Sequence, residues 1–372
     1  MKLTEIRYQP EKSQIYLGSP SIVRAPDNAL IAYHDYFGKL DNHKVCLSEI
    51  YRSEDEGETW ENVYHVIGAF WGALFATEDA VYLISCYAAH HMVVLRKSVD
   101  GGYTWTTPDS SENGLLFPDA QWDTSAPVQI LNGRVYRDVE PTVPYFCPAE
   151  FYASVISAPL NSDLLNSRNW TVSNKLRFDA MEMKKYHPEL VPGDDLKNYG
   201  WLEGNVLEKP DGSGLCNLMR IHLGVGNKAA FLELSPDGKT LSFDYENGII
   251  DFPGGSSKFT IRRDPVTKRY FALSNPVPCD QHLWCRNQLV ASWSDDLRHW
   301  HTFHTVLRDD SGLNKEDSIR LTGFQYPDWQ IDGDDMICAV RTAYRGANTF
   351  HNSNRITFHR IKDFRKKANS SL

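Results

Sequence analysis

The sequence predicts an all-β protein that folds as a six-bladed β-propeller, and three observations support this expectation. One eight-residue turn pattern, Ser-x-Asp-x-Gly-x-Thr-Trp, occurs at residues 53–60 and again at residues 98–105, so its tryptophans lie 45 positions apart. A period of this size is typical of one supersecondary unit copied around a ring. Segments of alternating apolar and polar residues, separated by turn signals, run along almost the whole chain. No long amphipathic helix is evident between them.

The strand segments group into six blades when each group is divided at the turn that follows its third strand. The predicted blades span residues 21–66, 72–107, 126–174, 205–245, 259–306 and 324–361. The sixth blade lacks a fourth strand, and residues 2–9 alternate like a strand without a local partner. Pairing these two segments would close the ring and remove an exposed sheet edge. Residues 178–200, rich in charge, proline and glycine, are expected to form a long inserted loop, so residues 1–372 are interpreted as a single propeller domain, with seven blades as the alternative.

The repeated turn has a physical explanation. Asp and Gly favour a tight turn between two strands, the Asp and Ser or Thr side chains bond local backbone, and the Trp fills the space beside the turn. Weaker copies occur at Ser235 to Gly238, at Asp295 to Trp300, and at Ser162 and Asp163 ahead of Trp170. The pattern is the signature known as the Asp-box or BNR repeat. On these residues the chain resembles the Asp-box, sialidase-like β-propeller superfamily.

Composition limits the partners that we expect. The formal net charge of −9 disfavours nucleic acid and anionic membranes. No run approaches the ~20 apolar residues of a membrane span, and the first residues form no apolar leader, which predicts a cytoplasmic protein. No metal or other cofactor is expected, because the adjacent His90 and His91 would point to opposite faces of a strand.

Propeller topology sorts the remaining residues by face. The turns with the repeated pattern lie at one end of the blades, whereas first strands begin and second strands end at the other. Aromatic, cationic and acidic residues gather at this second end, where a binding site would need them. Second strands end with His34 to Tyr36, His90 and His91, Arg220 to His222, Ser274 and Asn275, and Arg341 to Arg345; first strands begin with Phe70 and Trp71, Asp123 to Ser125, Trp201 to Asn205, Ser257 and Lys258, and Gln325 and Tyr326.

The resemblance to sialidases implies roles for some of these residues. Glu203, the turn segment that follows it and Arg220 are similar to a sialidase run, which implies that Glu203 and Arg220 face the site. The first-blade Arg-Ile-Pro of sialidases falls on Gly18, Ser19 and Pro20, so one carboxylate-binding arginine is absent. Arg341 and Lys258 are candidates for the missing cation.

A second branch of the superfamily is also similar: propellers that remove terminal rhamnose from glucuronic acid by hydrolysis or β-elimination. The segments that carry this resemblance are residues 18–24, 34–38 and 324–329. It implies chemistry that depends on a histidine, for which His34 is the matching residue.

These observations predict a carbohydrate-active enzyme, an exo-acting glycoside hydrolase on acidic, uronate-containing oligosaccharides. Glu203 or His34 would be the general acid or base, with Asp123 and Tyr344 as accessory catalytic residues. The predicted substrate-binding residues are the cations Arg220, Arg341 and Lys258, the indoles of Trp71 and Trp201, and His90, His91 and Asn205. A lyase that uses His34, His90 or Tyr344 as base and a non-catalytic glycan- or protein-binding propeller are the alternatives. Oligomeric state is left open.

Overall fold

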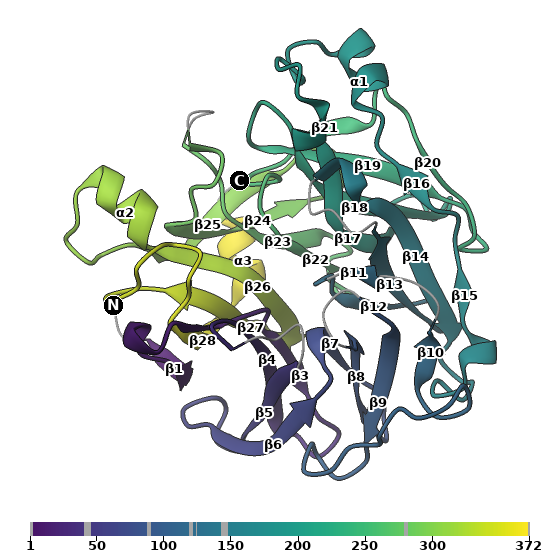
Figure 1. Ribbon diagram of the computed structural model, residues 1–372, viewed down its shortest axis with the longest axis vertical. Helices are drawn as coiled ribbons and strands as arrows, with labels where there is room; N and C mark the ends of the chain where they lie inside the picture. The colour runs from purple at the N-terminus through teal and green to yellow at the C-terminus, as the bar shows by residue number, and fades with distance from the viewer. Residues whose placement is uncertain are drawn as a thin grey trace.

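Six antiparallel sheets surround a central axis in the computed structural model, which describes residues 3–40, 46–87, 91–118, 122–123, 125–142, 148–278 and 282–370 (Figure 1). The chain is therefore a six-bladed β-propeller, as the sequence predicts. Within each blade the strands follow one another in antiparallel order, and the first strands of neighbouring blades contact one another around the axis. Within the described ranges, none of the helices is both long enough and apolar enough to cross a membrane.

The blades are numbered in chain order. Blade 1 contains β2 (Ile15–Leu17), β3 (Ser21–Arg24), β4 (Leu30–Gly38), β5 (Leu47–Ser53) and β6 (Glu61–Ile67). Blade 2 contains β7 (Phe70–Ala76), β8 (Val81–Cys86), β9 (Val93–Ser98) and β10 (Leu115–Phe117). Blade 3 contains β11 (Trp122–Asp123), β12 (Val128–Leu131), β13 (Arg134–Pro141), β14 (Tyr152–Pro159), β15 (Thr171–Val172) and β16 (Leu176–Arg177).

Blade 4 contains β17 (Gly200–Glu208), β18 (Leu215–His222), β19 (Lys228–Leu234), β20 (Leu241–Phe243) and β21 (Ile249–Asp251). Blade 5 contains β22 (Thr260–Arg263), β23 (Tyr270–Ser274), β24 (Gln288–Ser294) and β25 (His301–Arg308). Blade 6 contains β26 (Gly323–Asp332), β27 (Asp335–Ala343), β28 (Arg355–Ile361) and β1 (Thr4–Tyr8). The helices are α1 (Ala180–Tyr186), α2 (Lys315–Leu321) and α3 (Phe364–Asn369).

Blade 6 is built from both ends of the described chain. Strand β1 pairs antiparallel with β28, with Thr4 opposite Phe358 and Tyr8 opposite Arg355. Arg355 on β28 also donates from Nε to the Glu5 carboxylate at 2.6 Å. Strand β1 therefore pairs with the outer edge of β28. In a chain that began at β2, the backbone N–H and C=O groups of this edge would lack partners.

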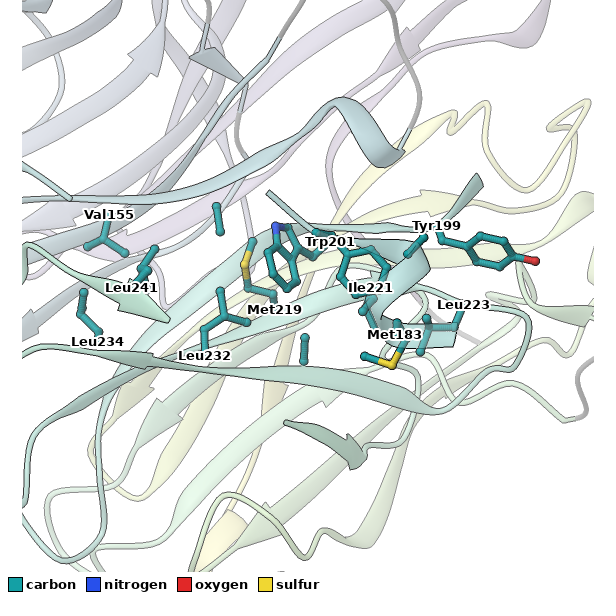
Figure 2. Packing of buried hydrophobic residues seen from close by; sticks show 14 of the residues in the cluster. Val155, Met183, Tyr199, Trp201, Met219, Ile221, Leu223, Leu232, Leu234 and Leu241 are labelled. Carbon is teal, nitrogen blue, oxygen red and sulfur yellow. The ribbon is translucent and has the colours of Figure 1, made fainter. Parts of the chain in front are cut away.

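Hydrophobic cores lie between the blades. One cluster joins Tyr136 and Val155 of blade 3 to Met219 and Leu232 of blade 4. Figure 2 shows Trp201 at the centre of this cluster, beside Met219 and Ile221. These side chains pack between the two sheets and bury apolar area that drives the blades together.

The segment 178–200, expected to be a loop, contains a short helix. Asp179 accepts a hydrogen bond from the Glu182 N–H at 3.0 Å and so caps helix α1. The helix buries Ala180 and Met183 against the cluster between blades 3 and 4. The sequence pattern did not predict this helix, because the segment is rich in charge and proline and only the inner side of the helix is apolar.

Both Ser-x-Asp-x-Gly-x-Thr-Trp turns make the local bonds that their residue types favour. In the second turn, Asp100 accepts from Ser98 Oγ at 2.9 Å, from the Thr104 N–H at 2.9 Å and from Thr104 Oγ1 at 2.6 Å. The Trp105 indole donates to Gly102 O at 2.9 Å. The first turn repeats this arrangement, with Asp55 and Trp60 in the equivalent places. The turns thus brace the third and fourth strands of their blades.

We expect Asp100→Ala to destabilise the protein without changing its chemistry. The variant removes three hydrogen bonds at one turn, which should cost about 1–3 kcal/mol of unfolding free energy. Thermal or urea unfolding measures this loss, and ligand affinity of the folded fraction should stay the same. A variant that keeps its stability but loses ligand binding would place these turns at the functional end.

Candidate active site

The functional end of the ring is the one at which first strands begin and second strands end. The opposite end carries the Ser-x-Asp turns, where Arg52 donates to Gly101 O at 3.0 Å and pairs with Asp27 at 2.9 Å. Near the axis at that opposite end, Arg262 donates to the backbone oxygens of Val128 and Trp329 and to Asp328. These cations are bonded to protein groups and hold the structure together at this end of the ring.

Three arginines surround the phenol ring of Tyr326 at the start of β26; Arg220, Arg286 and Arg341 are named the arginine cluster. Arg220 Nη1 lies 3.5 Å from the Tyr326 hydroxyl. The guanidinium carbons of Arg286 and Arg341 lie 5.6 Å and 5.0 Å from the centroid of the Tyr326 ring. All three arginines are at least nine-tenths buried, whereas Tyr326 is partly exposed. Such a concentration of positive charge favours an anion at this point.

Part of the donor capacity of the cluster is directed at the protein itself. Arg220 Nε donates to Ser256 O at 3.0 Å, and Arg341 donates to Ser353 Oγ at 3.2 Å and His351 O at 2.6 Å. Arg286 Nη1 donates to the Gln325 side chain. Among the described residues, Arg286 Nε has no hydrogen-bond partner. The arginines are thus held in place by the protein, and a buried donor is left for a ligand or water.

Glu203 is the carboxylate nearest the cluster. It accepts from Arg220 Nη1 at 2.7 Å and from Ser125 Oγ at 2.7 Å. Burial alone would raise the pKa of Glu203, but the charge of Arg220 and hydrogen bonds from Arg220, Ser125 and Tyr326 lower it below its ordinary value. Glu203 is therefore ionised at neutral pH and can accept a proton.

Tyr326 has the opposite balance. Burial and the neighbouring Glu203 charge raise the pKa of its phenol, and the arginine cluster opposes this effect only in part. The ground state is a neutral phenol hydrogen-bonded to an ionised carboxylate. This pairing of a hydroxyl with a base beside cations is an arrangement found in activated nucleophiles.

Three residues at this end of the ring share one backbone irregularity. Trp71, Glu203 and Tyr326 each have left-handed φ angles, of 49°, 59° and 52°. Each lies where the register shifts near the start of a first strand, in β7, β17 and β26. A bulge inserts a residue and redirects side chains locally. Three blades therefore use one irregularity at the same end of the ring.

The bulge in β17 explains why Trp201 is not beside Glu203 at the site. Simple alternation would place positions 201 and 203 on one side of the strand. The register shift between Leu202 and Gly204 breaks this alternation. The Trp201 side chain is 0% exposed in the core between blades 3 and 4, so its indole has no face available for a sugar (Figure 2).

Carboxyl groups from the preceding blade bind two of these bulges. Asp35 at the end of β4 accepts from the Trp71 N–H at 2.7 Å and the Ser19 N–H at 2.9 Å. Glu140 at the end of β13 accepts from the Glu203 N–H. Burial raises the pKa of Asp35 to about 6, although the two N–H donors oppose the shift. A Cβ at Gly18 would lie 1.6 Å from Asp35 Oδ1, which explains why no arginine can occupy this position.

The other predicted cation and amide hold the blades together. Lys258 is buried and donates to Thr260 Oγ1 at 2.8 Å and Pro327 O at 3.0 Å, directly behind Tyr326. Burial lowers the pKa of Lys258 to about 8. Asn205 accepts from the Ile261 N–H at 2.8 Å and so joins β17 to β22. Both side chains are buried and bonded to protein groups.

Two predicted catalytic residues lie away from the cluster. The His34 ring stacks on Tyr51 with centroids 5.6 Å apart, and its Nε2 lies 3.6 Å from the Glu49 carboxylate. It occupies the face of β4 opposite Asp35. The Tyr344 hydroxyl donates to Asp310, and its ring packs in the core of blades 5 and 6. On β4, strand alternation therefore directs Asp35, and not His34, toward the Trp71 bulge.

The remaining predicted residues lie at the edge of the site or outside the residues that the structure describes. Trp71 is partly exposed and packs against Phe70, with ring centroids 4.5 Å apart. His91 is exposed after the end of β8. Asp123 lies opposite Glu140 in the β11–β13 ladder, but its side chain is outside the described residues, as is all of His90.

Sequence reasoning brought Glu203, Arg220 and Arg341 together but missed Tyr326 as a reactive group, Arg286, and the carboxyl pair of Asp138 and Glu140. Tyr326 stood among the residues that begin first strands, so its position was a usable signal. Arg286 lies in the irregular segment before β24, where alternation gives no information. Within the described ranges, no three His, Cys, Asp or Glu side chains are arranged to hold a metal ion.

Several solved structures have the same fold as this chain. A microbial sialidase named Hadza Hz136 matches 96% of this chain and 68% of its own, with 13% identity and a TM-score of 0.63. An α-L-arabinanase of Penicillium chrysogenum, complexed with arabinobiose, matches 100% and 99% with 12% identity and a TM-score of 0.58. A protein of unknown function from Dyadobacter fermentans matches 97% and 99% with 15% identity and a TM-score of 0.59. Neither the known protein families nor the curated protein sequences contain a match to this chain.

Proposed function

We propose that this propeller is a glycoside hydrolase that removes a terminal sugar bearing a carboxylate, with a uronate as the substrate class. The observation that carries the proposal is the geometry around Tyr326: Arg220 Nη1 lies 3.5 Å from its hydroxyl and 2.7 Å from the Glu203 carboxylate, and the guanidinium groups of Arg286 and Arg341 lie near its ring. The names of two neighbouring folds, an arabinanase and a sialidase, support hydrolysis of a glycosidic bond.

The arginine cluster would bind the sugar carboxylate. Arg220, Arg286 and Arg341 carry three positive charges at buried positions, and among the described residues the ion pair that these arginines make is the one between Arg220 and Glu203. A ligand carboxylate would complete this balance and accept hydrogen bonds from planar guanidinium groups. Because the substrate must reach Tyr326 from the open end of the ring, a terminal sugar fits better than an internal one.

Tyr326 and Glu203 would carry out the bond cleavage. Glu203 accepts the phenol proton as the Tyr326 oxygen attacks the anomeric carbon; the glycosidic C–O bond breaks, and the departing oxygen takes a proton from water. A water molecule then attacks the same carbon and cleaves the bond to Tyr326; the Glu203 proton returns to the phenol oxygen, and the proton of the attacking water passes to solvent. A phenol is suited to this role because an anionic carboxylate would be repelled by the negative charge of the substrate. Two displacements at one carbon retain the anomeric configuration.

A matched pair of fluorogenic substrates tests the substrate class. We expect an aryl uronide to be cleaved with kcat/KM at least ~10-fold above that of the neutral hexoside with the same ring, because only the uronide engages the arginines. A simple sialoside should be cleaved negligibly, because blade 1 presents Asp35 where an additional cation would be needed.

The same assay separates the alternatives. Equal cleavage of uronide and hexoside would remove the arginine cluster from substrate recognition. Ultraviolet absorbance of an unsaturated uronate, in place of a reducing sugar, would identify a lyase. Binding of acidic oligosaccharides without any product would identify a glycan-binding module.

A further inference from the structure

The backbone around Glu203 lacks the hydrogen bonds that a regular strand would give it. The register between β17 and β18 shifts between Leu202 and Gly204, so the N–H groups of Glu203 and Gly204 need other acceptors. Two carboxyl groups of β13 supply them. Glu140 accepts from the Glu203 N–H, and Asp138 Oδ2 accepts from the Gly204 N–H at 2.9 Å.

We infer that Asp138 and Glu140 are positioning residues that hold Glu203 in its left-handed conformation and thereby aim its carboxylate at Tyr326. The inference rests on the proposed function, in which Glu203 is the base. It assigns a role to two buried acidic residues that do not contact the arginine cluster.

The hydrogen bonds assign one proton to the pair. Both oxygens of Asp138 accept from the protein, Oδ2 from the Gly204 N–H and Oδ1 from the Asn217 amide at 2.5 Å. Burial raises the pKa of Asp138, but these hydrogen bonds oppose the shift and favour Asp138 as the ionised member of the pair. Glu140 uses one oxygen for the Glu203 N–H and can donate a proton from the other to Asp138. Burial, followed by the charge of Asp138, raises the pKa of Glu140 well above its ordinary value. The charged groups around Glu140 are Asp138 on its own strand, Glu203 on β17 and nearby Arg137.

Two further observations indicate a specific arrangement. A Cβ at Gly204 would lie 2.8 Å from Asp138 Cγ and 2.4 Å from Asn217 Oδ1, so only glycine admits the Asp138 carboxylate here. Asp35 binds the Trp71 bulge from the preceding blade in the same way as Glu140 binds the Glu203 bulge. The carboxyl group at the end of a second strand is thus a repeated means of stabilising the next blade's bulge.

Substitutions at position 140 test the inference with a conservative rescue. Glu140→Gln keeps an oxygen for the Glu203 N–H and an N–H donor for Asp138, so kcat should stay within about 3-fold of the parent. Glu140→Ala removes the acceptor, and kcat should fall about 10- to 100-fold while KM for the uronide changes less than about 3-fold. Asp138→Asn replaces one of the two accepting oxygens with an NH2 donor, which would face either the Gly204 N–H or the Asn217 amide, and it should resemble Glu140→Ala. Asp100→Ala, destabilised at the opposite end, is the control that should retain kcat per folded molecule.

Each outcome is decisive. A folded but inactive Glu140→Gln would overturn the positioning role, because it would mean that Glu140 itself transfers a proton. Full kcat in Glu140→Ala would show that the contact is dispensable. A crystal structure of Glu140→Ala adds a readout that does not depend on activity: Glu203 should leave the left-handed region, and a φ angle that stays positive would refute the inference. If Glu203→Gln keeps full activity, the proposed function fails, yet this structural readout still tests whether Glu140 holds Glu203 in its left-handed conformation.

Discussion

Replacing Tyr326 by Phe is expected to lower kcat by about 10³-fold or more, because it deletes the oxygen that attacks the sugar. Phe keeps the ring that lies between Arg286 and Arg341, so the arginine cluster should stay in place. Affinity for a uronic acid, measured by calorimetry, should therefore change by less than about 10-fold. Loss of turnover with retained binding is the pattern that a nucleophile predicts.

Tyr344→Phe provides the comparison on the same blade. Its hydroxyl donates to Asp310 and not to Glu203, so we expect turnover close to that of the parent. If Tyr344→Phe abolished activity while Tyr326→Phe left it intact, the assignment of the reactive phenol would be reversed.

Glu203→Gln is expected to lower kcat by roughly 100-fold or more, since the amide retains the shape of the side chain but cannot accept the Tyr326 proton. The buried Arg220 would lose its charged partner at 2.7 Å, so some loss of stability should accompany the change. Turnover per folded molecule, obtained from kcat together with the folded fraction by circular dichroism, separates the two effects.

An ion pair that only joins β17 to β18 would give the reverse result: weaker folding and normal turnover of the folded fraction. His34→Ala distinguishes the histidine mechanism. If that variant lost activity without loss of fold, while Glu203→Gln were harmless, the reaction would depend on the network around Glu49 and not on the arginine cluster.

The blade arrangement was predictable because its signals are local. Each Ser-x-Asp turn closes its own hydrogen bonds within eight residues, so its sequence reports the strand connection directly. Antiparallel order within a blade then places Glu203 at the start of β17 and Arg220 near the end of β18 at one end of the ring. This inference needs only the strand order and is independent of side-chain detail.

The contents of the site were harder to predict because alternation identifies two faces without saying which one looks inward. His34 and Asp35 are neighbours on β4, and the choice between them depends on the packing of Tyr36 and Tyr51 around His34. Bulges add a second difficulty. An inserted residue in β17 reverses the expected side of Trp201. The isolated Gly204 within the strand pattern is a signal for such a bulge, but it does not say which side chains are redirected.

The left-handed conformations at Glu203 and Tyr326 lower the stability of the fold at two positions that catalysis requires. A residue with a side chain in this region costs on the order of 1–2 kcal/mol that glycine would not. A library screened only for survival at high temperature would therefore tend to enrich glycine or asparagine at these two positions and to discard enzymes that still turn over. Directed evolution of this propeller should score product formation in every round, and should look for added stability at the distal end of the ring, where the backbone has no catalytic geometry to preserve.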